Sequence, residues 1–213
     1  MEISFRQRLN VAMSQTKLTG WQSPLDVPDL DRPQKRPSDL PGDGKVAAVL
    51  ALFCDQSNDE KSDSLPTMPD LLLTQRAINL TNHGGQISFP GGRLEPGEST
   101  QQAAIRETEE EIGIHESKIE LFGQLTSVYI PPSDFTVTPY VGVIRGEPNF
   151  KRCPREVEQI VRAPLNQLMG PEALTSGTVT RSNGETLKVP CYRVGGHQIW
   201  GATAIMVGEL VQR

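Results

Sequence analysis

The strongest constraint on this chain is a run of acidic residues between Arg106 and Gly113, where four of five consecutive positions are glutamate. A helix is expected here, because Ser99 and Gln102 have the spacing of a capping box and Gly113 suits a C-terminal cap. Glutamates three or four positions apart share one helix face, where like charges cost about 0.2–0.5 kcal/mol per pair. The helix dipole disfavours anions near the C-terminal end by about a further 0.3–1 kcal/mol each. A positively charged group must therefore offset the repulsion between these carboxylates.

The opposite face of this helix carries apolar or small residues, at Ala104, Ile105, Thr108 and Ile112. We expect this face to pack on a sheet and to hold the acidic face outward, towards a cleft. Carboxylates without Cys or His nearby suit Mg²⁺, or Mn²⁺ as its substitute, better than zinc. Arg106 could pair with Glu98 and fix the preceding loop against the helix. A glutamate-rich helix alone is usually a solvated face, so a metal site is indicated only if the spacing of the surrounding residues also fits one.

That spacing resembles the box of the Nudix hydrolases, G-x5-E-x7-R-E-U-x-E-E-x-G-U, in which U is a bulky apolar residue. The matching positions in this chain are Gly92, Glu98, Arg106, Glu107, Glu110, Glu111, Gly113 and Ile114. Thr108 stands at the first U position, where its methyl group can still pack. At average residue frequencies, a chance match of seven fixed residues has a probability on the order of 10⁻⁸ per starting position.

The resemblance implies an α+β fold, a Nudix-type α/β/α sandwich with a mixed central sheet, and hydrolysis of a nucleoside diphosphate linked to another moiety. It implies Mg²⁺, or Mn²⁺ as its substitute, held by the backbone carbonyl of Gly92 and by the carboxylates of Glu107, Glu110 and Glu111. It also makes Glu98 and Arg106 a supporting ion pair. Glu110 is the general base that we favour within the box, and Glu158 is a candidate outside it.

A second pattern lies upstream, between Leu72 and Gly92. It is similar to the signature of the coenzyme A pyrophosphatase branch, L-L-T-x-R-S-x3-R-x3-G-x3-F-P-G-G, with every spacing preserved. Ala77 stands where that branch has Ser, and Thr81 where it has Arg. This similarity implies cleavage of coenzyme A or acyl-CoA to adenosine 3',5'-bisphosphate and 4'-phosphopantetheine. The candidate substrate-binding residues are Arg76, His83 and Arg93.

Several of these assignments have alternatives. Arg76 and Arg93 could be surface charges, and His83 between Asn and Gly suits a turn. Trp21 and Trp200 could each pack in the core or stack on an adenine ring. The missing arginine at Thr81 leaves an ADP-ribose or other nucleoside-diphosphate pyrophosphatase as an alternative. A non-catalytic Nudix sensor is the second alternative. Such proteins usually lack one or more glutamates of the box, whereas this chain has all of them.

Composition limits the possible partners. Lys and Arg number 21 against 26 Asp and Glu, and the net charge of −5 disfavours nucleic-acid binding by phosphate neutralisation alone. The cysteines, Cys54, Cys153 and Cys191, match neither a disulfide framework nor a Cys-x-x-Cys site. No signal-peptide core or membrane span is recognised. We therefore expect a cytoplasmic protein, monomeric or homodimeric, with a small-molecule nucleotide-diphosphate substrate and no membrane partner.

We expect the chain to divide into residues 1–44, an N-terminal helix and a proline-rich strap, and residues 45–213, which the resemblance makes a Nudix hydrolase domain. An apolar stripe of Phe5, Leu9, Ala12 and Met13 predicts packing of that helix on the domain. Strands are predicted at 46–53, 71–74, 86–89, 121–129 and 136–144, with an exposed loop at 55–70. Residues 155–168 and 202–211 are predicted to be helical, the latter amphipathic, and Asn183-Gly184 predicts a two-residue hairpin turn.

Overall fold

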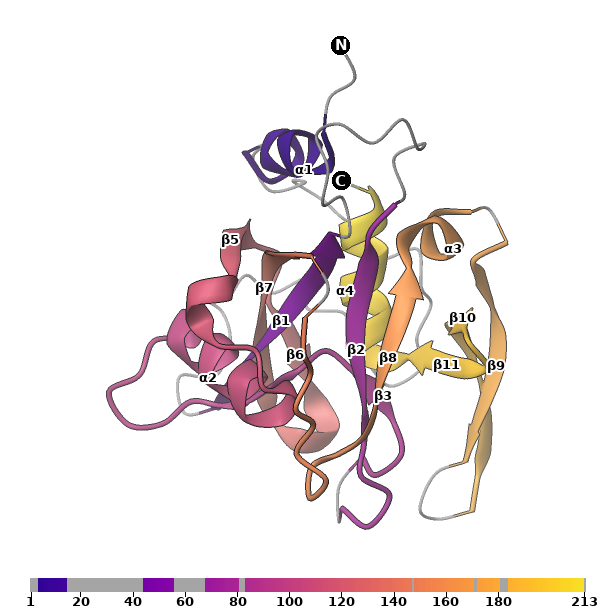
Figure 1. Ribbon diagram of the computed structural model, residues 1–213. Coiled ribbons are helices and arrows are strands. Elements are labelled where there is room, and N and C mark those ends of the chain that lie inside the picture. Colours follow the sequence, from indigo (N-terminus) through magenta and orange to yellow (C-terminus); the bar gives the residue numbers. More distant parts are fainter. Residues whose placement is uncertain are drawn as a thin grey trace.

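The computed structural model describes residues 4–14, 44–55, 68–80, 83–146, 148–170, 172–180 and 184–212. These residues form two β-sheets and four α-helices (Figure 1). The strands are β1 (Lys45–Asp55), β2 (Asp70–Arg76), β3 (Ile87–Ser88), β4 (Gly91–Arg93), β5 (Glu120–Gln124), β6 (Val128–Ile130), β7 (Phe135–Arg145), β8 (Val157–Pro164), β9 (Leu174–Thr180), β10 (Thr186–Val194) and β11 (His197–Trp200). The helices are α1 (Phe5–Ser14), α2 (Thr100–Ile112), α3 (Leu165–Met169) and α4 (Gly201–Gln212), with short 3-10 turns η2 (Glu116–Lys118) and η3 (Pro131–Ser133).

The larger sheet has eight strands, in the order β3-β2-β1-β7-β5, with β4, β6 and β8 pairing with β1, β7 and β2. Its central strands β1 and β7 run parallel along their whole length, whereas the remaining pairs are antiparallel. The sheet is therefore mixed, as predicted. The strands predicted at 46–53, 71–74, 86–89 and 136–144 are confirmed as β1, β2, β3 and β7.

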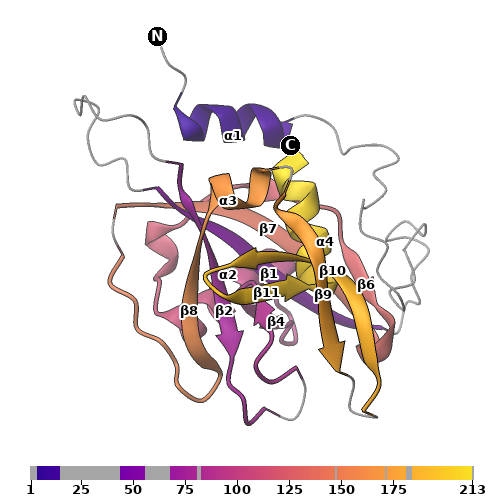
Figure 2. The ribbon, with the colours of Figure 1, turned by 90° about the vertical axis from the view of Figure 1, so that its right-hand side faces the viewer.

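Both faces of the larger sheet are covered. Ala48, Leu50 and Leu52 of β1 belong to the apolar cluster beneath α2. The alternate residues Ala51 and Phe53 belong to the cluster on the other side, which includes α4 (Figures 1 and 2). A strand buried on both faces needs apolar residues at nearly every position, which explains the continuous run at 46–53. The arrangement confirms the predicted α+β sandwich.

Helix α4 is buried on nearly all sides, so the prediction of an amphipathic closing helix was wrong. Nine of its twelve residues are buried, and one of them is Glu209. The smaller sheet, in the order β11-β10-β9, lies against α4 and covers the face that we expected to meet solvent (Figure 2). The Glu209 carboxylate accepts hydrogen bonds from the amide and hydroxyl groups of Thr126, at 2.9 and 3.2 Å.

Residues 155–168 are not one helix, and this prediction was also wrong. The segment forms strand β8, followed by the short helix α3. Val157 and Val161 stand at a spacing that suits either a helix or a strand, and antiparallel pairing with β2 selects the strand. Pro164 lies at the end of β8, and the helical turn begins only after it, at Leu165.

One further strand prediction needs correction. The strand predicted at 121–129 is divided into β5 and β6, both of which pair with β7. The hairpin of β9 and β10 is confirmed, but Thr180 lies opposite Thr186, a register that leaves five residues between the strands. The predicted two-residue turn at 183 and 184 falls partly outside the described residues and stays a prediction. Of the five connecting residues, 181–183 lie outside the described part of the chain.

Helix α1 packs on the larger sheet, as the apolar stripe predicts (Figure 2). Leu9 is buried, and the ring of Phe5 meets that of Phe53 edge to face with centroids 5.1 Å apart. Arg6 forms an ion pair with Glu120 of β5. The proline-rich strap, Thr81, Trp21 and most of the predicted loop at 55–70 lie outside the described residues. Among the described helices, none combines the length and apolar character needed to cross a membrane.

Candidate active site

Strand β4 and the turn before it bring the backbone close to helix α2. Gly92 pairs with Ala48 of β1, and a Cβ atom at Gly92 would lie only 2.3–2.5 Å from the carboxylate atoms of Glu107. Gly91 has a φ of 149°, and a Cβ there would lie 2.3 Å from the backbone oxygen of Ala48. Only glycine therefore lets this strand approach the acidic helix so closely.

Helix α2 begins and ends where the sequence predicts. Ser99 accepts a hydrogen bond from the amide of Gln102, and the reciprocal bond of the capping box is also present. Gly113 adopts the left-handed conformation at the C-terminal cap, with a φ of 75°. Thr108 is fully buried, and its hydroxyl donates to the carbonyl of Ala104 at 2.7 Å. Thr108 can therefore replace the bulky apolar residue of the box, because its hydroxyl is satisfied within the helix.

Three carboxylates converge beside Gly92. Glu107 and Glu111 of α2 and Glu156 from the loop before β8 each place a carboxylate oxygen within 4.8 Å of the others. We call these three residues the acidic cluster. The side chain of Glu111 is only 3 % exposed, so the acidic face does not point wholly outward as expected. Glu110 is 55 % exposed and lies outside the acidic cluster.

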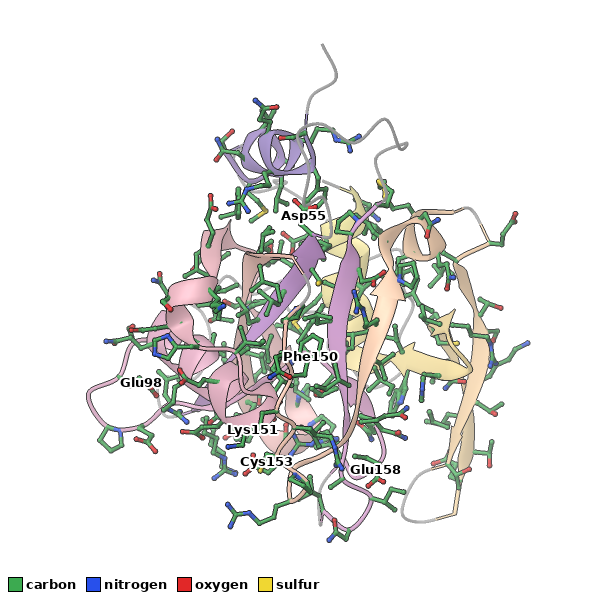
Figure 3. The ribbon with its side chains drawn as sticks, viewed as in Figure 1. Asp55, Glu98, Phe150, Lys151, Cys153 and Glu158 are labelled. Carbon is green, nitrogen blue, oxygen red and sulfur yellow. The ribbon has the colours of Figure 1, made fainter. Side chains whose placement is uncertain are left out.

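Glu156 is the member that sequence reasoning missed, although the stretch containing it and Glu158 was noted. Cys153, labelled in Figure 3, lies in the same loop. Its amide donates to the carbonyl of Glu111 at 2.9 Å and so fixes the loop to the C-terminal end of α2. The carbonyl of Glu156 accepts a hydrogen bond from the amide of Ala77, at 2.8 Å. These bonds orient Glu156 towards α2, whereas Glu158, the outside candidate for the base, is exposed.

Arg106 supplies the positive charge that the acidic helix requires. Its Nε and Nη2 atoms donate to Glu98 at 2.9 and 3.1 Å, and its Nη1 atom donates to Glu107 at 3.0 Å. Nη1 also reaches Glu110 at 3.4 Å, and Nη2 the carbonyl of Arg93 at 2.9 Å. The hydrogen bond from Arg106 holds the pKa of Glu98 below its ordinary value. The structure thus brings Glu98 and Arg106 together.

The three predicted substrate-binding residues lie in different places. Arg76 ends β2 beside the acidic cluster, with its Nη1 atom 4.0 Å from Oε1 of Glu111. His83 stands in the turn between β2 and β3 with a φ of 59°, and its Nδ1 atom lies 3.1 Å from Oε1 of Gln86. The guanidinium of Arg93 lies over the ring of Phe135, 4.9 Å from its centroid.

Trp200, for which packing and stacking were both considered, is half-buried at the end of β11. It pairs with Cys191 of β10 in the smaller sheet. Cys54, Cys153 and Cys191 all lie within the described residues and form no disulfide there, and Cys54 and Cys191 are buried.

Burial sets the electrostatics of the acidic cluster. It raises the pKa of Glu107, and it raises the pKa of Glu111 to about 8. Arg76 and a hydrogen bond from the backbone of Gly91 counteract the shift at Glu111 only in part. Atom Oε2 of Glu111 is buried without a hydrogen-bond partner. Because a buried unpaired carboxylate oxygen is costly, a cation is the missing partner that this chemistry indicates.

The donor set of the acidic cluster fits a hard divalent cation. Its members are all carboxylates, and the backbone of Gly92 lies next to Glu107. Such oxygen ligands suit Mg²⁺ and Mn²⁺. The residues present can therefore hold a divalent ion. The acidic cluster contains Glu156 and not Glu110, so a ligand role for Glu110 stays a prediction.

Comparison with known proteins places this geometry in context. The family model described as NUDIX domain matches residues 45–182. Over 185 residues, the chain is 32 % identical to a protein from Photorhabdus laumondii named Uncharacterized Nudix hydrolase NudL, covering 86 % of this chain and 91 % of that protein. Over 108 residues, it is 43 % identical to Nudix hydrolase 3 of Caenorhabditis elegans. That match covers 49 % of this chain but only 45 % of the worm protein.

Among solved structures, a MutT/nudix family protein from Enterococcus faecalis aligns with a TM-score of 0.49 and 16 % sequence identity. The alignment covers 100 % of this chain and 73 % of the bacterial one.

Proposed function

Since the chain belongs to the Nudix domain family, we propose that it is a divalent-metal-dependent diphosphatase that cleaves coenzyme A or acyl-CoA. The products would be adenosine 3',5'-bisphosphate and 4'-phosphopantetheine. The single observation that supports this proposal most strongly is the acidic cluster, with its buried Glu111 oxygen that has no hydrogen-bond partner. A non-catalytic sensor would have no need to keep such a costly group.

The residues that would hold the metal are Glu107, Glu111 and Glu156, with the backbone carbonyl of Gly92. We propose Mg²⁺, with Mn²⁺ as its substitute, because every side-chain ligand is a carboxylate. When bound, the metal supplies neutralisation of the anionic diphosphate and acidifies the attacking water. The chain itself supplies the rigid placement of the carboxylates, through α2 and the hydrogen bonds of Cys153 and Ala77.

Glu98 and Arg106 act in this proposal as a positioning pair. Through its bonds to Glu98 and to the carbonyl of Arg93, Arg106 joins the loop after β4 to helix α2. Its bond to Glu107 orients that carboxylate within the acidic cluster. Removal of Arg106 would therefore loosen the site without removing a metal ligand.

We propose Glu110 as the general base. Its carboxylate is exposed and lies beside the acidic cluster on the same helix, where Arg106 holds it at 3.4 Å. A base must accept the proton of the attacking water and release it to solvent, and an exposed carboxylate can do both. The acidic cluster members would meanwhile be engaged as ligands.

The substrate class rests on the stretch from Leu72 to Gly92, which matches the signature of the coenzyme A pyrophosphatase branch apart from Ala77 and Thr81. Arg76, at the edge of the acidic cluster, would contact the diphosphate. His83 and Arg93 would contact more distant parts of the substrate. Because Thr81 removes an arginine from the signature, ADP-ribose or another nucleoside-diphosphate derivative is the second candidate substrate.

A substrate panel tests the proposal. Purified protein with Mg²⁺ would be incubated with coenzyme A, acetyl-CoA and ADP-ribose, and the products identified by mass spectrometry. We expect 4'-phosphopantetheine and its acyl form, and loss of about a hundredfold or more in rate for Glu111→Gln. Cleavage of ADP-ribose with coenzyme A left intact would favour the second candidate. Failure to cleave any of the three would contradict the enzymatic proposal.

A further inference from the structure

The ion pair between Arg76 and Glu111 is unusually loose. Its nitrogen and oxygen atoms are 4.0 Å apart, compared with 2.9 Å between Arg106 and Glu98. Charged hydrogen bonds normally measure about 2.7–2.9 Å. Arg76 therefore lies close enough to favour the ionised form of Glu111, but does not form the hydrogen bonds of a permanent salt bridge.

Both partners of this pair contain a buried atom without a hydrogen bond. These atoms are Nε of Arg76 and Oε2 of Glu111. A buried polar atom without a partner is destabilising, so two at one place need an explanation. Complementary ligands would satisfy both, a cation at the glutamate and an anion at the arginine. The side chain of Arg76 is 31 % exposed, so an anion in solution can reach it.

The backbone of Arg76 is fixed in this position. The register between β2 and β8 shifts between Gln75 and Arg76, an irregularity of the kind that redirects side chains at functional sites. The amide of Arg76 donates to the carbonyl of Gln86 at 2.9 Å, and its carbonyl accepts from Gly85 at 3.0 Å. The next amide, that of Ala77, bonds to Glu156 of the acidic cluster. A change of partner by Arg76 therefore requires only side-chain motion.

We infer that Arg76 is an exchangeable counterion. Without a divalent ion its guanidinium lies against Glu111, and once an ion occupies the acidic cluster, the Arg76 guanidinium turns to the diphosphate of the substrate. This inference rests on the proposed function, since it needs a divalent ion and an anionic substrate at the same site. It predicts that Arg76 weakens metal binding in the free protein and couples metal binding to substrate binding.

Titration calorimetry with Mn²⁺ tests the first half. Arg76→Gln should bind Mn²⁺ about tenfold more tightly than the wild-type protein, since a competing positive charge is lost. Arg76→Met is a second neutral variant with a longer apolar stem, and Arg76→Lys keeps the charge and should stay near wild type. Arg155→Gln removes the same charge from an exposed position next to Glu156, and should change the affinity by no more than about threefold.

The second half is tested with α,β-methylene-ADP, a diphosphate that resists cleavage, after correction for its own affinity for Mn²⁺. In the wild-type protein this probe should tighten Mn²⁺ binding. The factor by which it increases the Mn²⁺ affinity should be about tenfold smaller in Arg76→Gln and Arg76→Met. Unchanged or weaker Mn²⁺ binding by both neutral variants would overturn the inference while leaving the proposed function intact. Absence of Mn²⁺ binding by the wild-type protein would instead overturn the proposed function.

Discussion

Replacement of Glu111 by glutamine should stabilise the metal-free protein, and increasingly so as the pH rises. Burial raises the pKa of Glu111 to about 8, from an ordinary value of 4.5. Between these values the folded protein keeps a proton that the unfolded chain releases, so the folded state loses stability as the pH increases. Glutamine resembles the protonated carboxyl in shape and has no charge to bury.

The magnitude follows from the same two values. At 1.36 kcal/mol for each pKa unit, the rise from 4.5 to about 8 corresponds to roughly 5 kcal/mol once the pH exceeds both. Relaxation and water entry reduce such penalties, so we expect about 2–4 kcal/mol. This is a large fraction of the roughly 5–15 kcal/mol that stabilises a typical domain.

Urea unfolding in EDTA measures the effect, for the wild-type protein and Glu111→Gln, at about pH 5 and about pH 8.5. The free energies of unfolding should be close at the lower pH and differ by about 2–4 kcal/mol at the higher one, with the variant more stable. Glu109→Gln is the control, because it removes an exposed carboxylate from the same helix and should change stability by no more than about 0.5 kcal/mol. A wild-type protein as stable as Glu111→Gln at the higher pH would refute the reasoning.

Three further changes test other parts of the site. Gly92→Ala places a Cβ within 2.3–2.5 Å of the Glu107 carboxylate and should displace that carboxylate. The Mn²⁺ affinity measured by calorimetry should therefore fall at least about tenfold. An affinity equal to that of the wild-type protein would contradict the close approach of Gly92 to Glu107. Arg106→Ala removes both hydrogen bonds to Glu98 and should lower the free energy of unfolding by about 2 kcal/mol; a change below about 0.5 kcal/mol would show that the pair is dispensable. Thr108→Val removes one hydrogen bond within the helix, so it should change stability by no more than about 1.5 kcal/mol and leave the rate of hydrolysis unaltered. A large loss of rate would instead assign the hydroxyl a role in the reaction.

Local sequence signals predicted helix α2 well, because capping and side-chain pairs within a helix depend on residues a few positions apart. Ser99 and Gly113 begin and end the helix as expected. Glu98 and Arg106, eight positions apart, meet because the loop after β4 folds back on the first turns of α2. The continuous apolar run of β1 likewise reflects burial on both faces, which is visible in the sequence itself.

The remaining features depend on contacts between distant segments. Glu156 joins the acidic cluster because Cys153 bonds to the carbonyl of Glu111 at the end of α2, and no spacing in the sequence encodes that contact. Residues 155–168 form β8 and α3 rather than one helix because β2 offers an edge for pairing. Helix α4 is covered by the smaller sheet, and its burial is decided by that packing rather than by its own periodicity.

The central claim is that the acidic cluster holds a divalent ion, and anomalous diffraction from crystals grown with Mn²⁺ tests it most directly. We expect a strong anomalous peak between the carboxylates of Glu107, Glu111 and Glu156, close to the backbone of Gly92. We also expect this peak to be lost in Glu111→Gln. A peak found only beside the exposed carboxylate of Glu109, or no peak in the wild-type protein at saturating Mn²⁺, would contradict this claim.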